Sequence, residues 1–161
     1  MTILAPMRHE NFLSFAEAAN AGYAQDNVAA GRWTCDEAPA RAQAEFEQLL
    51  PQGLATPDHY VYEIQGEATG EMIGFLWFAV VGKGEVHFAY IYNIGVAQSF
   101  RGRGHAKAAL LWLEQFVRAQ GIADVRLNVF AHNSSAQVLY RSLGFECTSM
   151  MMRKALSADG A

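Results

Sequence analysis

The sequence predicts a single α/β domain in which about four helices are interleaved with six or seven strands. Its 161 residues match the usual length of one domain. Apolar residues make up 52% and charged residues 17%, a composition that supplies a substantial core and excludes global disorder. Helical and strand periodicities alternate, and no repeat or linker divides the chain. We therefore expect one domain over residues 1–156, followed by a frayed tail at 157–161.

The elements follow from the spacing of the apolar residues. A short strand is expected over 3–4 and a helix over 10–21, which ends where Gly22 follows it. The later strands are expected over 59–64, 72–81, 87–96, 125–129 and 145–154, and the later helices over 106–120 and 134–142.

A further helix ends at Leu50, and its start stays open between two positions. Thr34 and Glu37 form a capping-box pattern. With Asp36 as the cap, Pro39 would instead fall in the first turn, where proline costs little.

Composition also excludes several classes of protein. The first ten residues lack a basic region followed by an apolar block, so we expect no secretory signal. The longest apolar run, over 72–81, is too short to span a bilayer. Cys35 and Cys147 cannot form a disulfide framework, and no Cys/His cluster has zinc spacing. The expectation is a cytoplasmic protein with reduced cysteines, no metal and no membrane partner.

The distribution of charge is uneven. The net charge of −4 argues against general affinity for nucleic acid. Residues 1–80 carry eleven acidic and three basic side chains, whereas residues 81–161 carry five acidic and nine basic ones. The second part therefore suits an anionic ligand, and the first part a cation.

The segment 101–106 has the features of a phosphate site. Two glycines lie between a strand and a helix, where the backbone can approach a ligand and the helix start presents unpaired N–H groups. Arg101, Arg103 and Lys107 add positive charge. The nucleoside triphosphate loop is excluded because Gly104 is not followed by Lys and Ser or Thr. A dinucleotide fingerprint is excluded because it needs Gly or Ala where Lys107 stands.

These residues resemble the GNAT superfamily of N-acetyltransferases. Arg101-x-x-Gly104-x-Ala106 matches the family's Gln/Arg-x-x-Gly-x-Gly/Ala signature, and Ile94-Gly95-Val96 precedes it at the family's usual distance. The family's Asn…Ala…Leu-Tyr…Gly-Phe pattern is matched downstream by Asn133, Ala136, Leu139, Tyr140, Gly144 and Phe145. The resemblance covers residues 87–154 and implies one mixed, mostly antiparallel sheet flanked by helices.

The resemblance implies acetyl-CoA as co-substrate and gives roles to individual positions. Backbone groups of Ile94 and Val96 would bind the pantetheine arm as an added strand does, with Gly95 as a bulge residue beside them. Asn133 would contact the same arm, although it suits the N-cap of a helix equally well. The pyrophosphate would be held by backbone N–H groups of the segment that follows Arg101, namely Gly102, Arg103, Gly104, His105, Ala106 and Lys107.

Tyr140 is the predicted catalytic residue. A phenol has a pKa of ~10 and a thiol one of ~8.5, so a protonated tyrosine can donate to a departing thiolate at neutral pH. The alternative is that Tyr140 belongs to the core with Ala136, four residues away. No strong general base is evident, which leaves open His132, a water relay, an acid of the N-terminal helices or an amine that arrives neutral.

The sequence thus predicts direct acetyl transfer to a primary amine of a small molecule or peptide. Neither cysteine falls in the motif region, which argues against a covalent enzyme intermediate. The alternative function is a non-catalytic acyl-CoA-binding module or sensor. The methionines at 150–152 suggest a monomer or a weak homodimer through the last strand.

Overall fold

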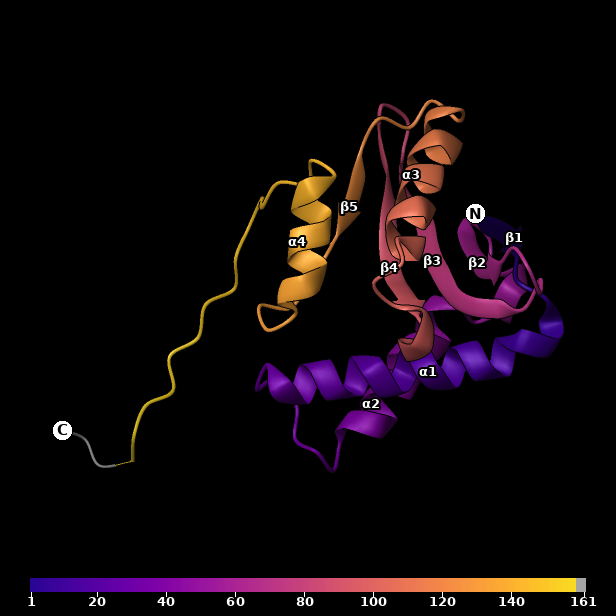
Figure 1. Cartoon of the computed structure of the whole chain (residues 1–161). Coiled ribbons are helices and arrows are strands. Elements are labelled where there is room, and N and C mark those ends of the chain that lie inside the picture. Colours follow the sequence, from indigo (N-terminus) through magenta and orange to yellow (C-terminus); the bar gives the residue numbers. More distant parts are fainter. Residues whose placement is uncertain (159–161) are drawn as a thin grey trace.

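A computed structural model describes residues 1–158 and contains one five-stranded sheet (Figure 1). The strands follow one another in sequence order across the sheet. Three neighbouring pairs are antiparallel, and the last pair, β4 with β5, is parallel. Their bounds are β1 (Thr2–Pro6), β2 (His59–Gly66), β3 (Met72–Lys83), β4 (Val86–Val96) and β5 (Val125–Leu127).

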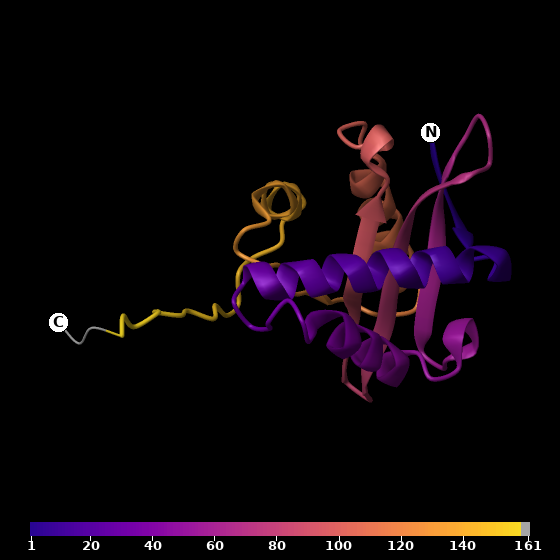
Figure 2. The same ribbon diagram turned by 90° about the horizontal axis from the view of Figure 1, so that it is seen from below.

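Helices cover both faces of this sheet. Figure 2 shows α1 (His9–Ala29) and α2 (Ala38–Leu49) crossing one face, with α3 (His105–Arg118) behind the strands. The helix α4 (Ser134–Ser142) lies beyond β5, and two short 3₁₀ turns lie at Gly53–Ala55 and Gln98–Phe100. The predicted α/β class with one mixed sheet and four helices is confirmed.

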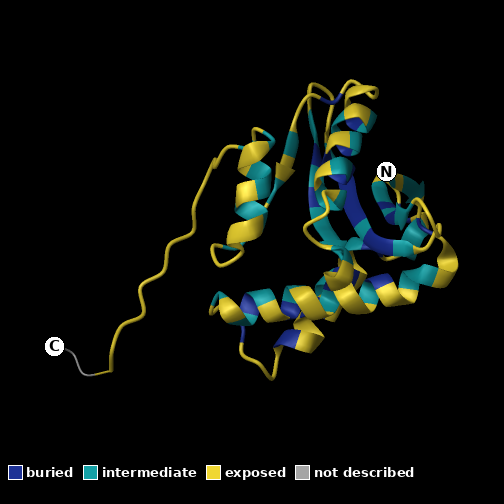
Figure 3. Cartoon of the chain, viewed as in Figure 1, coloured by how far each residue is buried: buried dark blue, intermediate teal, exposed yellow. Residues whose placement is uncertain are grey.

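The core is divided by the sheet into two main layers. On one face Phe78, Leu110 and Leu113 are fully buried between the strands and α3. On the other face Phe15 packs edge-on against Trp77, with ring centroids 6.0 Å apart, and joins α1 to the sheet. Figure 3 shows that burial is concentrated in these strands and helices, whereas α4 contains no buried residue.

The first two helices differ from their predicted bounds. The predicted end of α1 at residue 21 is wrong, because the helix continues through Gly22 to Ala29 and buries Ala24 against Trp33. The N-cap of α2 is Glu37, so neither of the two predicted caps, Thr34 or Asp36, holds that position, although Pro39 does fall in the first turn. Thr34 and Glu37 exchange side-chain to backbone hydrogen bonds of 3.3 and 3.4 Å, as the capping-box pattern indicates.

The predicted number of strands, six or seven, is wrong. The segment 145–154 is extended but pairs with no strand of the described residues, and it is almost entirely exposed. The N–H and C=O groups of a strand are bonded to a neighbouring strand, and this segment has no such neighbour among the described residues. It is therefore not part of the sheet. Of the tail expected at 157–161, residues 159–161 lie outside the described part. No helix of residues 1–158 is long and apolar enough to cross a membrane.

One buried carboxylate fixes the start of α1 on the sheet. Glu63 of β2 is fully buried, and it accepts hydrogen bonds from the backbone and side chain of Arg8 at 2.9–3.2 Å, from Asn11 at 2.7 Å and from Gln65 at 2.9 Å. Burial acts to raise the pKa of Glu63, but these hydrogen bonds outweigh it and lower the pKa to about 2.

Replacing Glu63→Gln is expected to destabilise the fold by about 2 kcal/mol at neutral pH, because Arg8 and Asn11 lose a charged acceptor. The half-exposed position of Arg8 keeps the loss below that of a fully buried pair. Because the folded-state pKa lies below the ordinary 4.5, this stabilisation is present above pH 4.5 and is lost as the pH falls towards 2. Urea unfolding at several pH values measures it.

Glu71→Gln is the matched control. Glu71 is exposed in the turn between β2 and β3, so this change should leave stability unchanged. Equal stability of the Glu63→Gln and Glu71→Gln variants would contradict the role given to Glu63.

Candidate functional site

The site begins where β5 separates from β4. The three residues of β5 pair only with Ala89, Tyr90 and Ile91. On its other side β4 stays paired with β3 as far as Val96. Residues 92–96 of β4 therefore have a strand on one side and an open edge on the other, within the described chain.

The polar backbone groups on this open edge can be assigned from the ladder. Ala97 N–H donates to the carbonyl of Ile73 at 2.8 Å, so Ala97 faces β3. Residues along an antiparallel ladder alternate, so Gly95 also faces β3, while Ile94 and Val96 point to the open side. The side chain of Arg101 confirms this direction, because its Nε donates to the Val96 carbonyl at 2.9 Å.

The predicted bulge at Gly95 is wrong. The register shifts between Trp77, opposite Asn93, and Phe78, opposite Ile91, so that Tyr92 is the extra residue. Gly95 has a different role: a β-carbon there would lie 2.8 Å from the ring of Phe75, so the ring would have to shift. That ring packs edge-on against Phe15, with ring centroids 5.0 Å apart, and lines the same cavity as Gly95.

The glycine-rich segment lies between the end of β4 and α3. Gly102 and Gly104 have φ angles of +72° and +84°, a left-handed conformation that favours glycine, and no atoms lie within 4 Å of where their β-carbons would stand. Gly104 is the N-cap of α3, so the first N–H groups of the helix have no partner within it. The side chain of His105 is directed to β1, because its Nδ1 lies 3.0 Å from the hydroxyl of Thr2.

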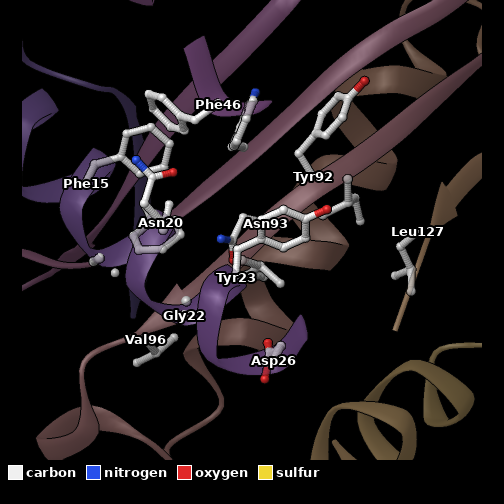
Figure 4. A pocket seen from close by; sticks show the side chains of 18 of the residues that line it. Phe15, Asn20, Gly22, Tyr23, Asp26, Phe46, Tyr92, Asn93, Val96 and Leu127 are labelled. Carbon is white, nitrogen blue, oxygen red and sulfur yellow. The ribbon is translucent and has the colours of Figure 1, made fainter. Parts of the chain in front are cut away.

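A cavity of about 740 Å³ lies between α1, α2, β4, β5 and α4 (Figure 4). It brings together part of the predicted site, because its lining includes Ile94, Gly95, Val96, Arg101, Asn133 and Tyr140. The rest of the predicted phosphate segment, residues 102–107, lies outside this lining. Glu85 and His87, at the other end of β4, do not line the cavity.

The helix α4 contributes Asn133 and Tyr140 to the cavity. Asn133 is the N-cap of α4, and its Oδ1 accepts from the Ala136 N–H at 3.3 Å. Tyr140 is half-buried, and its ring lies 5.6 Å from that of Phe145. Burial raises the pKa of Tyr140 above its ordinary value of 10, so the phenol is protonated at neutral pH.

Acidic side chains of the N-terminal helices also line the cavity. Asp26 of α1 lies 2.9 Å from Nε2 of His132, and this pair joins α1 to the loop that precedes α4. Glu45 of α2 accepts a 2.8 Å hydrogen bond from the Tyr23 hydroxyl. Burial and this bond both raise the pKa of Tyr23. The contact between Asp26 and His132 was not predicted, because the two residues are 106 positions apart in the sequence.

An aromatic stack supports the wall formed by β4. Trp77 and Tyr92 lie face to face with ring centroids 4.9 Å apart, and His59 stacks on Tyr92 at 5.4 Å. Trp77 Nε1 donates to His59 Nδ1 at 3.0 Å, which requires that nitrogen to be unprotonated. Among the described residues, no group of three or more His, Cys, Asp or Glu side chains is placed to hold a metal ion.

Comparison with known sequences points to one family. Residues 26–145 match the sequence model of the acetyltransferase (GNAT) family. The chain is 38% identical over 157 residues to a Bacillus subtilis protein named uncharacterized N-acetyltransferase YycN, covering 97% of this chain and all of that one. It is 34% identical to uncharacterized N-acetyltransferase YdgE of the same organism, covering 95% and 97% of the two chains.

Comparison with solved structures agrees. The crystal structure of YycN from Bacillus subtilis superimposes with a TM-score of 0.92 at 36% sequence identity, covering 98% of this chain and 99% of that one. Because the alignment with the YycN structure covers 98% of this chain, it includes most of the extended segment 145–156.

The pKa of His59 is expected below its ordinary value of 6.5, because burial disfavours the charged ring and outweighs the nearby Asp58. Neutral His59 is thus the form that the fold stabilises, and stability should fall as the pH drops below 6.5. NMR titration of the His59 ring measures the midpoint. Trp77→Phe removes the donor to Nδ1 and should move the midpoint up, whereas a midpoint above 6.5 in the unaltered chain would contradict the assignment.

Proposed function

The chain belongs to the acetyltransferase (GNAT) family, and we propose that it transfers the acetyl group of acetyl-CoA directly to a primary amine of a small molecule or peptide. The open edge of β4 over residues 92–96, which borders the cavity, is the observation that carries this proposal. Membership of the family favours an enzyme over the alternative, a non-catalytic acyl-CoA-binding module.

The residues beside the open edge suit acetyl-CoA. The N–H and C=O groups of Ile94 and Val96 would bind the amide groups of the pantetheine arm, as an added strand does. Asn133 keeps its Oδ1 in the helix cap and has its Nδ2 hydrogens to offer the same arm. The left-handed Gly102 and Gly104 leave space for a pyrophosphate at the start of α3, with Arg103 and Lys107 nearby in the chain.

Acetyl-CoA would supply a thioester that accepts the amine nitrogen at its carbonyl carbon and releases a thiolate. Tyr140, from the α4 side of the cavity, would donate its hydroxyl proton to that thiolate. Both cysteines, Cys35 and Cys147, are exposed and outside the cavity lining, which argues against an acetyl-cysteine intermediate. Direct transfer is therefore the mechanism we propose.

The acceptor amine would enter the part of the cavity between α1, α2 and β4. Asp26 and Glu45 supply negative charge there, and Tyr23 and Tyr92 supply aromatic walls, a combination that suits a cationic amine. The amine must lose a proton before it attacks. Asp26, in contact with His132, and Glu45 are the acids of the N-terminal helices that can take part in its removal, directly or through water.

A panel of primary amines tests the function, with free CoA measured as it is released and the products identified by mass. We expect release of CoA only with particular amines, matched by a product heavier by one acetyl group. Tight binding of acetyl-CoA with no acetylated product from small amines or peptides would instead support the binding module.

Gly104→Val is expected to weaken acetyl-CoA binding by about tenfold or more, because a branched side chain would enter the space left for phosphate. Valine also strains the backbone at a φ of +84°. Gly121→Val, at a φ of +77° beyond the other end of α3, brings similar strain away from the site and serves as the control. Calorimetry that gives both variants the same affinity would overturn the phosphate assignment.

Tyr140→Phe is expected to reduce turnover by roughly 10²-fold, because it removes the proton donor and keeps the ring. Acetyl-CoA affinity and melting temperature should change little, since one hydroxyl contributes about 1 kcal/mol. Tyr60→Phe, in the layer against α3 and outside the cavity lining, is the control. Retained turnover in the Tyr140→Phe variant would leave protonation of the thiolate to water or a backbone donor.

A further inference from the structure

The segment that follows α4 is extended and mostly exposed, and it carries four large apolar side chains on its surface. Residues 145–157 have no helical or paired-strand structure, and Figures 1 and 2 show them leading away from the body of the molecule. Met151 is 95% exposed, and Met150, Met152 and Leu156 are 73–83% exposed. Large apolar side chains gathered so closely on a surface are typical of a contact with another molecule.

The path of this segment takes it past α1 rather than along β5. The guanidinium carbon of Arg153 lies 2.8 Å from the point that a β-carbon on Gly31 would occupy, just beyond the C-terminal end of α1. Arg153 is thus directed to the turn between α1 and α2. The segment does not fold back beside β5, the strand that precedes α4.

The sheet meanwhile keeps a vacant place at β5. In the order of strands β5 is last, so its outer edge bonds to no strand among residues 1–158. The neighbouring helix α4 has no buried residue, and its apolar side chains at Leu139, Tyr140 and Leu143 are only half-buried. Both the edge and the helix lack the strand that would cover them.

We propose that the segment 146–156 of one copy of the chain pairs as a strand with the outer edge of β5 in a second copy, so that two copies exchange these segments. An exchange of this kind is reciprocal and closes as a dimer with two-fold symmetry. The segment that would occupy the edge of β5 comes from a second copy. Within one copy the segment runs past the end of α1, where Arg153 lies beside Gly31, and so does not reach the edge of its own β5.

The sequence of the segment suits this position. In a strand Met150 and Met152 share one face, and Met151 takes the other. A strand that is covered on both faces needs apolar side chains on both faces, and three consecutive methionines supply them. Methionine is flexible enough to fill the irregular space beneath a loosely packed helix.

Sedimentation velocity of the full chain at micromolar concentrations tests the proposal. We expect a dimer, and we expect Met151→Asp to raise its dissociation constant by about tenfold or more, because an acid would be buried at the contact. Leu13→Asp is the control, since Leu13 is 69% exposed on α1, away from the segment. A full-length monomer, or a dimer equally affected by both changes or by neither, would overturn the proposal.

Cross-linking distinguishes exchange from a strand that folds back on its own chain. In a background with Cys35→Ser and Cys147→Ser, one preparation carries Arg126→Cys on β5 and another carries Met151→Cys. After mixing and treatment with a short bismaleimide, exchange predicts covalent dimers that contain one chain of each kind. A chain that carries both changes and forms the cross-link within itself, with no mixed dimer, would overturn the proposal.

Discussion

The divergence of β5 from β4 after Ile91 is the constraint on which the rest of the site depends. Up to that point the two strands are bonded as a parallel pair, and beyond it β4 continues alone with β3. The bulge at Tyr92 lies at the divergence and bends the strand away. What results is an open edge at Ile94 and Val96 that borders the cavity, where the Val96 carbonyl accepts a hydrogen bond from Arg101 Nε.

Local patterns in the sequence were sufficient to predict the glycine-rich segment before α3 and the start of α4. The glycines at 102 and 104 and the cap at Asn133 act on their immediate neighbours, so their residue types and spacing indicate what the backbone does. The extent of α1 was not predictable in this way. Gly22 is a plausible stop by itself, but the helix continues because Ala24 is buried against residues of the following turn and α2.

Features that depend on strand register or on distant pairs left no such signal. The bulge falls at Tyr92 because of how β4 aligns with β3, and the Phe75 ring that a β-carbon at Gly95 would crowd lies across the sheet. The contact between Asp26 and His132 joins two ends of the fold. The last predicted strand has strand-like residues at 145–154 but pairs with no strand among residues 1–158. The proposed exchange would supply a partner and would also hold the helix that carries Tyr140.

The most direct test of the proposed binding mode is amide hydrogen exchange at β4, measured by NMR with and without CoA. The account predicts that the amides of Ile94 and Val96 exchange more slowly when CoA is bound, because they point to the open edge. The amide of Gly95, already directed at β3, should change much less. Unchanged exchange at Ile94 and Val96 under saturating CoA would contradict the claim that this edge binds the pantetheine arm.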